Sequence, residues 1–139
     1  MGQKFSIKKP NVNQGKNITA KNETPSFSQF DYPIFCFKHL HQGEFGVERC
    51  DTQDQAALLK RLNKLSQMSW QQINTAQRHG LGWEKISQSS VRAGIPRHVT
   101  PDVDLLAFRF SGLAPFVGYR NLAVFHILFI DSKFNLYNH

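Results

Sequence analysis

Four short apolar runs decide the fold of this chain: LAFRF at residues 106–110, APFVGYR at 114–120, VFHILFI at 124–130 and FNLYNH at 134–139. Turn residues separate the runs, at Ser111-Gly112, Arg120-Asn121 and Asp131-Ser132. Short runs rich in aromatic and β-branched residues, bounded by turn residues, are typical of strands. The stretch therefore predicts an antiparallel meander that forms the C-terminal part of the domain.

The residues before the meander predict a strand and the first of two helices. Residues 32–40 (YPIFCFKHL) have the apolar content of a strand. A helix is expected to begin near Thr52, because Thr52 and Gln55 form the pattern of a capping box. Its apolar face carries three leucines at helical spacing, with Leu59 beside them: Leu58, Leu62 and Leu65.

A second capping pattern, Ser69 with Gln72, predicts a second helix that ends before Gly80. The two helices would form a hairpin with a very short joint. The expected fold is therefore α+β: an N-terminal strand, a helix hairpin, then a C-terminal antiparallel meander with the helices packed on one face.

Charge and composition divide the chain into a tail and one domain. The 139 residues carry a net charge of +7, and 40% of them are hydrophobic. Residues 1–29 hold five lysines and one glutamate, and we expect a flexible basic tail there, followed by a single α+β domain at 30–139. The first residues, MGQKFS, also fit a myristoylation pattern, and a chance match is the alternative.

No run reaches the roughly 20 apolar residues of a membrane span, so no integral membrane association is expected. No secretory signal is visible, and two cysteines do not make a disulfide framework, so we expect a cytoplasmic location. Cys36, His39, His41 and Cys50 lack the spacing of a known zinc pattern. A core cysteine and edge histidines are the preferred interpretation, and we expect neither a metal nor a cofactor.

The middle of the chain is basic: residues 55–101 hold seven Lys and Arg and a single acid, Glu84. Around Gly80 and Gly82, the residues Arg78, His79 and Lys85 favour a phosphate-binding loop, and a helix C-cap is the equal alternative. The polar stretch 87–99 predicts a loop that carries Arg92, Arg97 and His98.

Assumed loop lengths fix a register for the meander, in which Phe108 faces Phe116, Phe116 faces Ile127 and Ile127 faces Leu136. One face is then apolar, with Gly118 making room for its rings. It carries Leu106, Phe108, Phe110, Phe116, Phe125, Ile127, Phe129, Phe134 and Leu136. The opposite face carries Arg109, Val117, Tyr119, His126, Tyr137 and His139. In this register His126 lies beside Tyr137, and Arg109 and Tyr119 are diagonal neighbours.

The polar face has the groups needed to cut RNA by 2′-hydroxyl attack. Arginine stabilises the charge of a phosphorane-like transition state, histidine moves a proton near neutral pH, and tyrosine stacks on a base. The alternative is the ordinary polar surface of an antiparallel sheet.

The order of strand, helix hairpin, basic loop and meander over residues 30–139 resembles the RelE/ParE superfamily of small basic toxins from bacterial toxin–antitoxin modules. The resemblance rests on topology and composition, without a specific motif. It implies an enzyme that cuts messenger RNA on the ribosome, as RelE does, or a protein that acts on DNA gyrase, as ParE does. It also implies a partner antitoxin, and a site of scattered basic and aromatic residues that includes Arg109, Arg120, His126, Tyr137 and His139.

The sequence thus favours a metal-independent endoribonuclease, in the setting of a toxin that inhibits translation. Its expected partner is RNA, and the resemblance implies RNA on the ribosome. The candidate catalytic residues are His126, Arg109, Tyr137, His79 and Arg120. The candidate nucleic-acid-binding residues are Lys60, Arg61, Lys64, Arg78, Lys85, Arg97, Tyr119 and His139. The alternatives are a nucleic-acid-binding or regulatory module without catalysis, whose basic segments contact phosphates, and a protein-interaction role.

Overall fold

The structure is a computed structural model, and it describes residues 31–77 and 80–138. The predicted tail at 1–29, the myristoylation pattern, Arg78, His79 and His139 lie outside the described residues. Among the residues that are described, no helix is both long and apolar enough to cross a bilayer.

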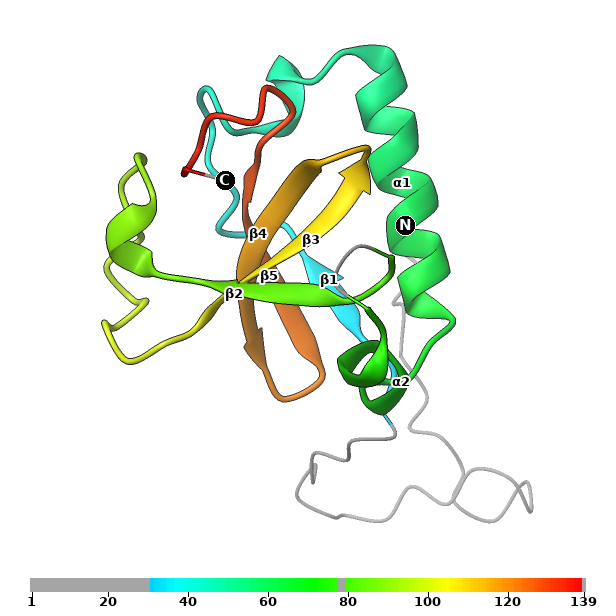
Figure 1. Cartoon of the computed structure of the whole chain (residues 1–139). Coiled ribbons are helices and arrows are strands. Elements are labelled where there is room, and N and C mark those ends of the chain that lie inside the picture. Colours follow the sequence, from blue (N-terminus) through cyan, green and yellow to red (C-terminus); the bar gives the residue numbers. More distant parts are fainter. Residues whose placement is uncertain (1–30, 78–79, 139) are drawn as a thin grey trace, which may run out of the picture.

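A five-stranded mixed sheet forms the centre of the fold, which confirms the α+β class (Figure 1). The strands are β1 (Ile34–Cys36), β2 (Trp83–Ile86), β3 (Leu105–Ser111), β4 (Ala114–Asn121) and β5 (Val124–Ile130). Their order across the sheet is β1-β5-β4-β3-β2, and only the pair β1–β5 is parallel. The first strand of the described chain therefore lies beside the last.

Two predictions about the strands were wrong. Residues 83–86, expected within a glycine loop or a helix cap, form β2 because they pair along β3 from Trp83–Phe108 to Ile86–Leu105. The fourth apolar run, FNLYNH, contributes no strand among its described residues. The side chain of Asp131 instead turns the chain away from the sheet, by accepting the N–H groups of Asn135 and Leu136.

Two helices pack against one face of the sheet: α1 (Thr52–Ser66) and α2 (Trp70–Thr75). The N-cap of α1 is Asp51, whose carboxylate accepts the N–H of Asp54, so the cap predicted at Thr52 was one residue late. The capping box of Ser69 and Gln72 is confirmed at the start of α2. Two short 3₁₀ turns complete the helical elements, at Val47–Arg49 and Gln88–Ser90.

Apolar side chains from the two helices and the sheet form the first core. Its buried members include the predicted Leu58, Leu62 and Leu65. Leu59 does not belong to this face, because 69% of it is exposed. Trp70 is fully buried, and its indole Nε1–H donates to the carbonyl of Ala123 at 2.9 Å. This bond ties α2 to the β4–β5 turn.

A second core fills the opposite face of the sheet, where loops rather than helices cover it (Figure 1). Side chains of residues 45, 91–103 and 136–137 pack there against Ala107, Val117 and Leu128. The second face is therefore largely buried, whereas the sequence predicted an open polar surface. Polar side chains on this face include Glu84 and Arg109 on β2 and β3, and Tyr119 and His126 on β4 and β5.

The predicted register holds for β3–β4 and fails for β4–β5. Phe108 does pair with Phe116, but Phe116 pairs with Ile130, and Gly118 pairs with Ile127. The β4–β5 turn lies one residue later than expected, at Leu122-Ala123, where Leu122 has φ of 55°. A bulge at Leu128 then shifts the register, so that Phe129 lies in the second core and not in the first. Leu136 also lies in the second core, because its segment leaves the sheet at Asp131.

Gly118 is required where β4 and β5 approach each other. A Cβ at this position would overlap the backbone carbonyl oxygen of His126 and lie 3.0 Å from the ring of Phe125. The sequence predicted that Gly118 makes room for aromatic rings, and the ring of Phe125 does lie against it. The backbone carbonyl of His126 is closer still, and it is the stronger reason why only glycine fits.

Candidate functional site

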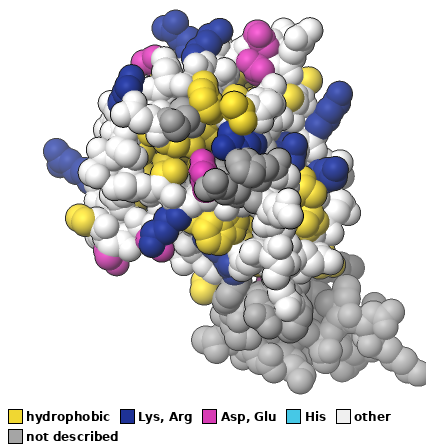
Figure 2. Space-filling view, in the orientation of Figure 1, with side chains coloured by type: hydrophobic (Ala, Val, Ile, Leu, Met, Phe, Trp, Pro, Cys, Tyr) yellow, Lys and Arg dark blue, Asp and Glu magenta, His cyan; other side chains and the backbone are white. Residues whose placement is uncertain are grey.

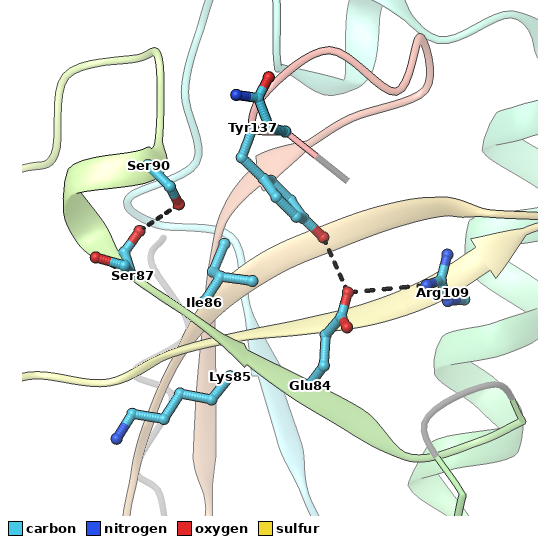
Figure 3. A pocket seen from close by; sticks show the side chains of 8 residues that line it. Glu84, Lys85, Ile86, Ser87, Ser90, Arg109 and Tyr137 are labelled. Atoms are coloured by element: carbon cyan, nitrogen blue, oxygen red, sulfur yellow. Dashed lines mark hydrogen bonds and ion pairs between the residues drawn. The ribbon is translucent and has the colours of Figure 1, made fainter.

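Three polar side chains converge in a pocket at the β2 edge of the second face: Glu84, Arg109 and Tyr137 (Figure 3). Glu84 and Arg109 are diagonal neighbours, because Glu84 on β2 pairs with Ala107 on β3. The Arg109 Nη2 lies 3.8 Å from the Glu84 Oε1, and only 16% and 25% of the two side chains are exposed. The phenol of Tyr137 donates to the same Oε1 at 3.4 Å.

Tyr137 reaches this pocket from the segment after β5, in which both backbone groups of the preceding residue, Leu136, are hydrogen-bonded. Asp131 is fully buried and fixes the N–H of Leu136, while the Leu136 carbonyl accepts the N–H of Arg92 at 2.8 Å. Burial, and then the charge of Glu84, raises the pKa of the Tyr137 phenol far above its usual range. The phenol therefore stays protonated and acts as a hydrogen-bond donor to the carboxylate.

Arg109 lies where β3 continues past the end of β2, since the last pair of these strands is Trp83–Phe108. The guanidinium is anchored by a bond from its Nη1 to the carbonyl of Leu113 at 2.9 Å. An arginine held at two of its nitrogens presents the rest of its fork in a fixed direction, which suits the binding of phosphate oxygens.

The pocket itself measures about 440 Å³, a size typical of small-ligand sites. Lys85, Ser87, Ser90 and Asn138 complete its polar lining. It thus combines a carboxylate that can accept a proton with a guanidinium, a phenol and hydroxyl groups that can bind an anion. We call this set the Glu84 pocket.

A second polar cluster lies over β4 and β5 on the same face and contains Tyr119, His126, His98 and His39. Tyr119 stacks on His126 with ring centroids 4.8 Å apart, and its hydroxyl lies 2.9 Å from the Nε2 of His98. His39 packs on His98 at 4.1 Å and lies 6.0 Å from His126. We call these residues the histidine cluster.

Two imidazoles of the histidine cluster, His39 and His126, have lowered pKa values, which favours their neutral forms. Burial, followed by the charges of His39 and His98, lowers the pKa of His126, and burial followed by His98 lowers that of His39. Burial also raises the pKa of Tyr119. The Nδ1 of His126 is buried without a hydrogen-bond partner. Within residues 31–77 and 80–138, no group of three or more His, Cys, Asp or Glu side chains is arranged to hold a metal ion.

The structure separates residues that the sequence placed together. His126 lies beside Tyr119 and not beside Tyr137, and Arg109 faces Pro115, four residues before Tyr119. Arg120 is on the helix side of the sheet, where its guanidinium lies 4.2 Å from the ring centre of Trp70. The predicted β4–β5 register was wrong because the turn lies one residue later, which sets His126 opposite Tyr119. The predicted single site was wrong because residues 134–138 form no strand beside β5, so Tyr137 lies at Glu84 and not at His126. The confirmed β3–β4 register itself keeps Arg109 away from Tyr119.

The remaining candidates are dispersed. Lys60, Arg61 and Lys64 of α1 border a groove of about 230 Å³ with Phe110 on the helix side. Arg97 is exposed in the loop before β3, and Lys85 borders the Glu84 pocket. Figure 2 likewise shows Lys and Arg side chains scattered over the visible face rather than gathered in one patch.

Sequence reasoning missed Glu84, the group with the clearest chemical capacity. A signal was present, because Glu84 is the only acid in the basic stretch 55–101. The same reasoning mentioned His98 and His39 only as a loop residue and an edge histidine, although both join His126.

Comparisons with protein-family models, with curated proteins and with solved structures find no match to this chain.

Proposed function

We propose that the protein is an endoribonuclease that cleaves RNA by attack of a ribose 2′-hydroxyl group on the adjacent phosphate. The observation that carries the proposal is the convergence of Glu84, Arg109 and Tyr137 in one pocket of ligand size. These are a base, a cation and a positioning donor, which together cover the needs of this reaction.

In the proposed reaction Glu84 accepts the proton of the 2′-hydroxyl group as the 2′ oxygen bonds to phosphorus. Arg109 stabilises the negative charge that grows on the phosphate oxygens, and Tyr137 keeps the carboxylate directed into the pocket. The bond from phosphorus to the 5′ oxygen breaks, and solvent in the open pocket protonates that oxygen. The products are a 2′,3′-cyclic phosphate and a 5′-hydroxyl end.

Purified protein incubated with single-stranded RNA tests this proposal. We expect Glu84→Gln and Arg109→Ala each to lower the cleavage rate by roughly 100-fold or more. Glu48→Gln is the matched control, because Glu48 is exposed and lies outside the pocket. A 2′-deoxy substitution at the cleaved nucleotide should abolish cleavage there. Cleavage of the deoxy substrate, or full activity of Glu84→Gln, would contradict the proposal.

The toxin setting adds a cellular prediction. If the chain acts as a translation inhibitor, induced expression arrests growth and Glu84→Gln relieves the arrest. Equal arrest by both forms would exclude RNA cleavage in the Glu84 pocket as the cause. An antitoxin partner remains part of this proposal and is tested by recovering an inhibitory protein from the same operon.

A non-catalytic nucleic-acid-binding role is the second candidate, and the α1 groove favours it. Three cations there line an apolar floor formed in part by Phe110. Such a surface binds phosphates without sequence preference and with a steep dependence on salt. This role predicts RNA binding that weakens in Lys60→Ala/Lys64→Ala, with no RNA cleavage by the wild-type protein.

A further inference from the structure

A second pocket of about 350 Å³ adjoins the Glu84 pocket along the end of β2. The two pockets share Lys85, Ile86 and Ser87 in their linings. The second pocket adds Gln88, Pro101, Val103 and Asp104. Alternation along β2 directs the Lys85 side chain away from Glu84, Arg109 and Tyr137 (Figure 3). An RNA chain bound beside Arg109 therefore reaches the second pocket by passing around the edge strand β2.

The amide of Gln88 is held in one orientation. Its Nε2 donates to the carbonyls of Thr100 at 2.8 Å and Val103 at 2.7 Å. Both partners are acceptors, so the nitrogen must face them and both of its hydrogens are used. The carbonyl oxygen Oε1 is left as the group that Gln88 presents to a ligand, and it can only accept a hydrogen bond.

Lys85 and Asp104 supply a hydrogen-bond donor and an acceptor beside the Gln88 amide oxygen. Their side chains form an ion pair of 3.0 Å and are 63% and 60% exposed, so a ligand can reach both. Pro101 and Val103 add apolar surface against which a flat ring can pack. The polar side-chain groups of the pocket are therefore one cationic donor, one carboxylate, one amide carbonyl and the hydroxyl of Ser87, which is already engaged with Ser89.

From this pattern we infer that the second pocket binds a guanine base of the RNA, across the β2 edge from the cleaved phosphate. Guanine carries an acceptor, O6, followed by two donors, the N1–H and the N2 amino group. Lys85 matches O6, while Asp104 and Gln88 accept from the two donors. Uracil has only one donor on this edge, and adenine and cytosine place an acceptor where guanine has N1–H. The inference rests on the proposed ribonuclease function and names the base that it selects.

Mapping of cleavage sites on a single-stranded RNA of mixed sequence tests the selection. We expect cuts at a fixed short distance from a guanosine at least about tenfold more often than at that distance from other bases, since one well-formed pair of hydrogen bonds discriminates by this order. Asp104→Asn should remove most of the preference. Asp102→Asn, the same change in the same loop but outside the pocket lining, should keep it. Cleavage without base preference by the wild-type protein would overturn the inference and leave the ribonuclease proposal intact.

Direct binding separates the two proposals. Guanosine 5′-monophosphate is titrated against the full chain, with inosine 5′-monophosphate as the probe that lacks only the N2 amino group. Tighter binding of the guanosine nucleotide, by about fivefold or more, that is lost in Asp104→Asn supports the base pocket even if no RNA is cleaved. Equal affinity for the guanosine, inosine and adenosine nucleotides would overturn it, whatever the cleavage assay shows.

Discussion

Replacement of Asp131 offers the sharpest test of how the fold positions the Glu84 pocket. Its carboxylate is fully buried, and the two oxygens accept separate backbone N–H groups: Oδ1 from Asn135 at 2.8 Å and Oδ2 from Leu136 at 2.9 Å. These bonds fix the segment that brings Tyr137 to Glu84. Removal of the carboxylate therefore affects stability and the site together.

The magnitude follows from the two bonds. A hydrogen bond to a charged group stabilises a protein by about 1.5–3 kcal/mol, so Asp131→Ala should lower the free energy of unfolding by about 3–6 kcal/mol. Asp131→Asn keeps one acceptor oxygen and turns its amide donor toward the second N–H, so it should lower that free energy by about 1.5–3 kcal/mol. Cleavage of RNA should fall in both variants, because Tyr137 loses its support.

Urea unfolding followed by tryptophan fluorescence measures these differences, with Asp102→Asn as the control for loss of an exposed carboxylate. The reasoning fails if Asp131→Ala unfolds within about 0.5 kcal/mol of the wild-type protein. It also fails if Asn and Ala at this position are equally destabilising, since the carbonyl oxygen of Asn should retain one of the two bonds.

Three further predictions follow from the same structure. Gly118→Ala should lower the free energy of unfolding by about 1–3 kcal/mol or more, because the new Cβ overlaps the His126 carbonyl oxygen. Thermal unfolding measures this change. An unchanged melting temperature would show that β4 and β5 can move apart at no cost. The pKa values of His39 and His126 are lowered in the folded protein, which therefore binds fewer protons than the unfolded chain. The free energy of unfolding should therefore be highest above about pH 7.5 and decline as the pH falls through 6.5. The decline should be less steep in His126→Gln. A urea midpoint that does not change between pH 5 and 8 would disprove this. Tyr137→Phe should cost about 1 kcal/mol of stability and reduce RNA cleavage by less than Glu84→Gln does, and kinetic assays in which the two variants are equally impaired would give the phenol a larger role than positioning.

The parts of the fold that were predictable are those that local chemistry determines. The capping box of Ser69 and Gln72 and the leucine face of α1 depend on residues within a few positions of each other. The pairing of Phe108 with Phe116 follows from one short loop. In contrast, β2 is a strand because β3 offers it a partner, and its sequence WEKI between a glycine and a serine gives no strong local signal.

Only part of the candidate site could be predicted, because its residues are brought together by long-range strand pairing. Arg109 and Tyr137 were assigned to the correct face from alternation along the meander. Glu84 was missed because it was placed in a loop. His126 and Tyr137 lie apart because the Asp131 carboxylate turns residues 134–138 away from β5, which no local pattern indicates. Long-range pairing therefore determined which polar groups meet.

The parallel pair β1–β5 has a consequence for the order in which the chain folds. Ile34 on β1 pairs with Val124 on β5, which is 90 positions later in the sequence. In contrast, β3, β4 and β5 are joined by short turns. Contacts that close long loops form late, so we expect the meander to nucleate folding and β1 to dock afterwards. The Glu84 pocket also needs Tyr137, so a nascent chain contains Glu84 before it contains the tyrosine that donates to its carboxylate. Until residue 137 has been made and Asp131 has turned the chain, the growing polypeptide carries an incomplete pocket.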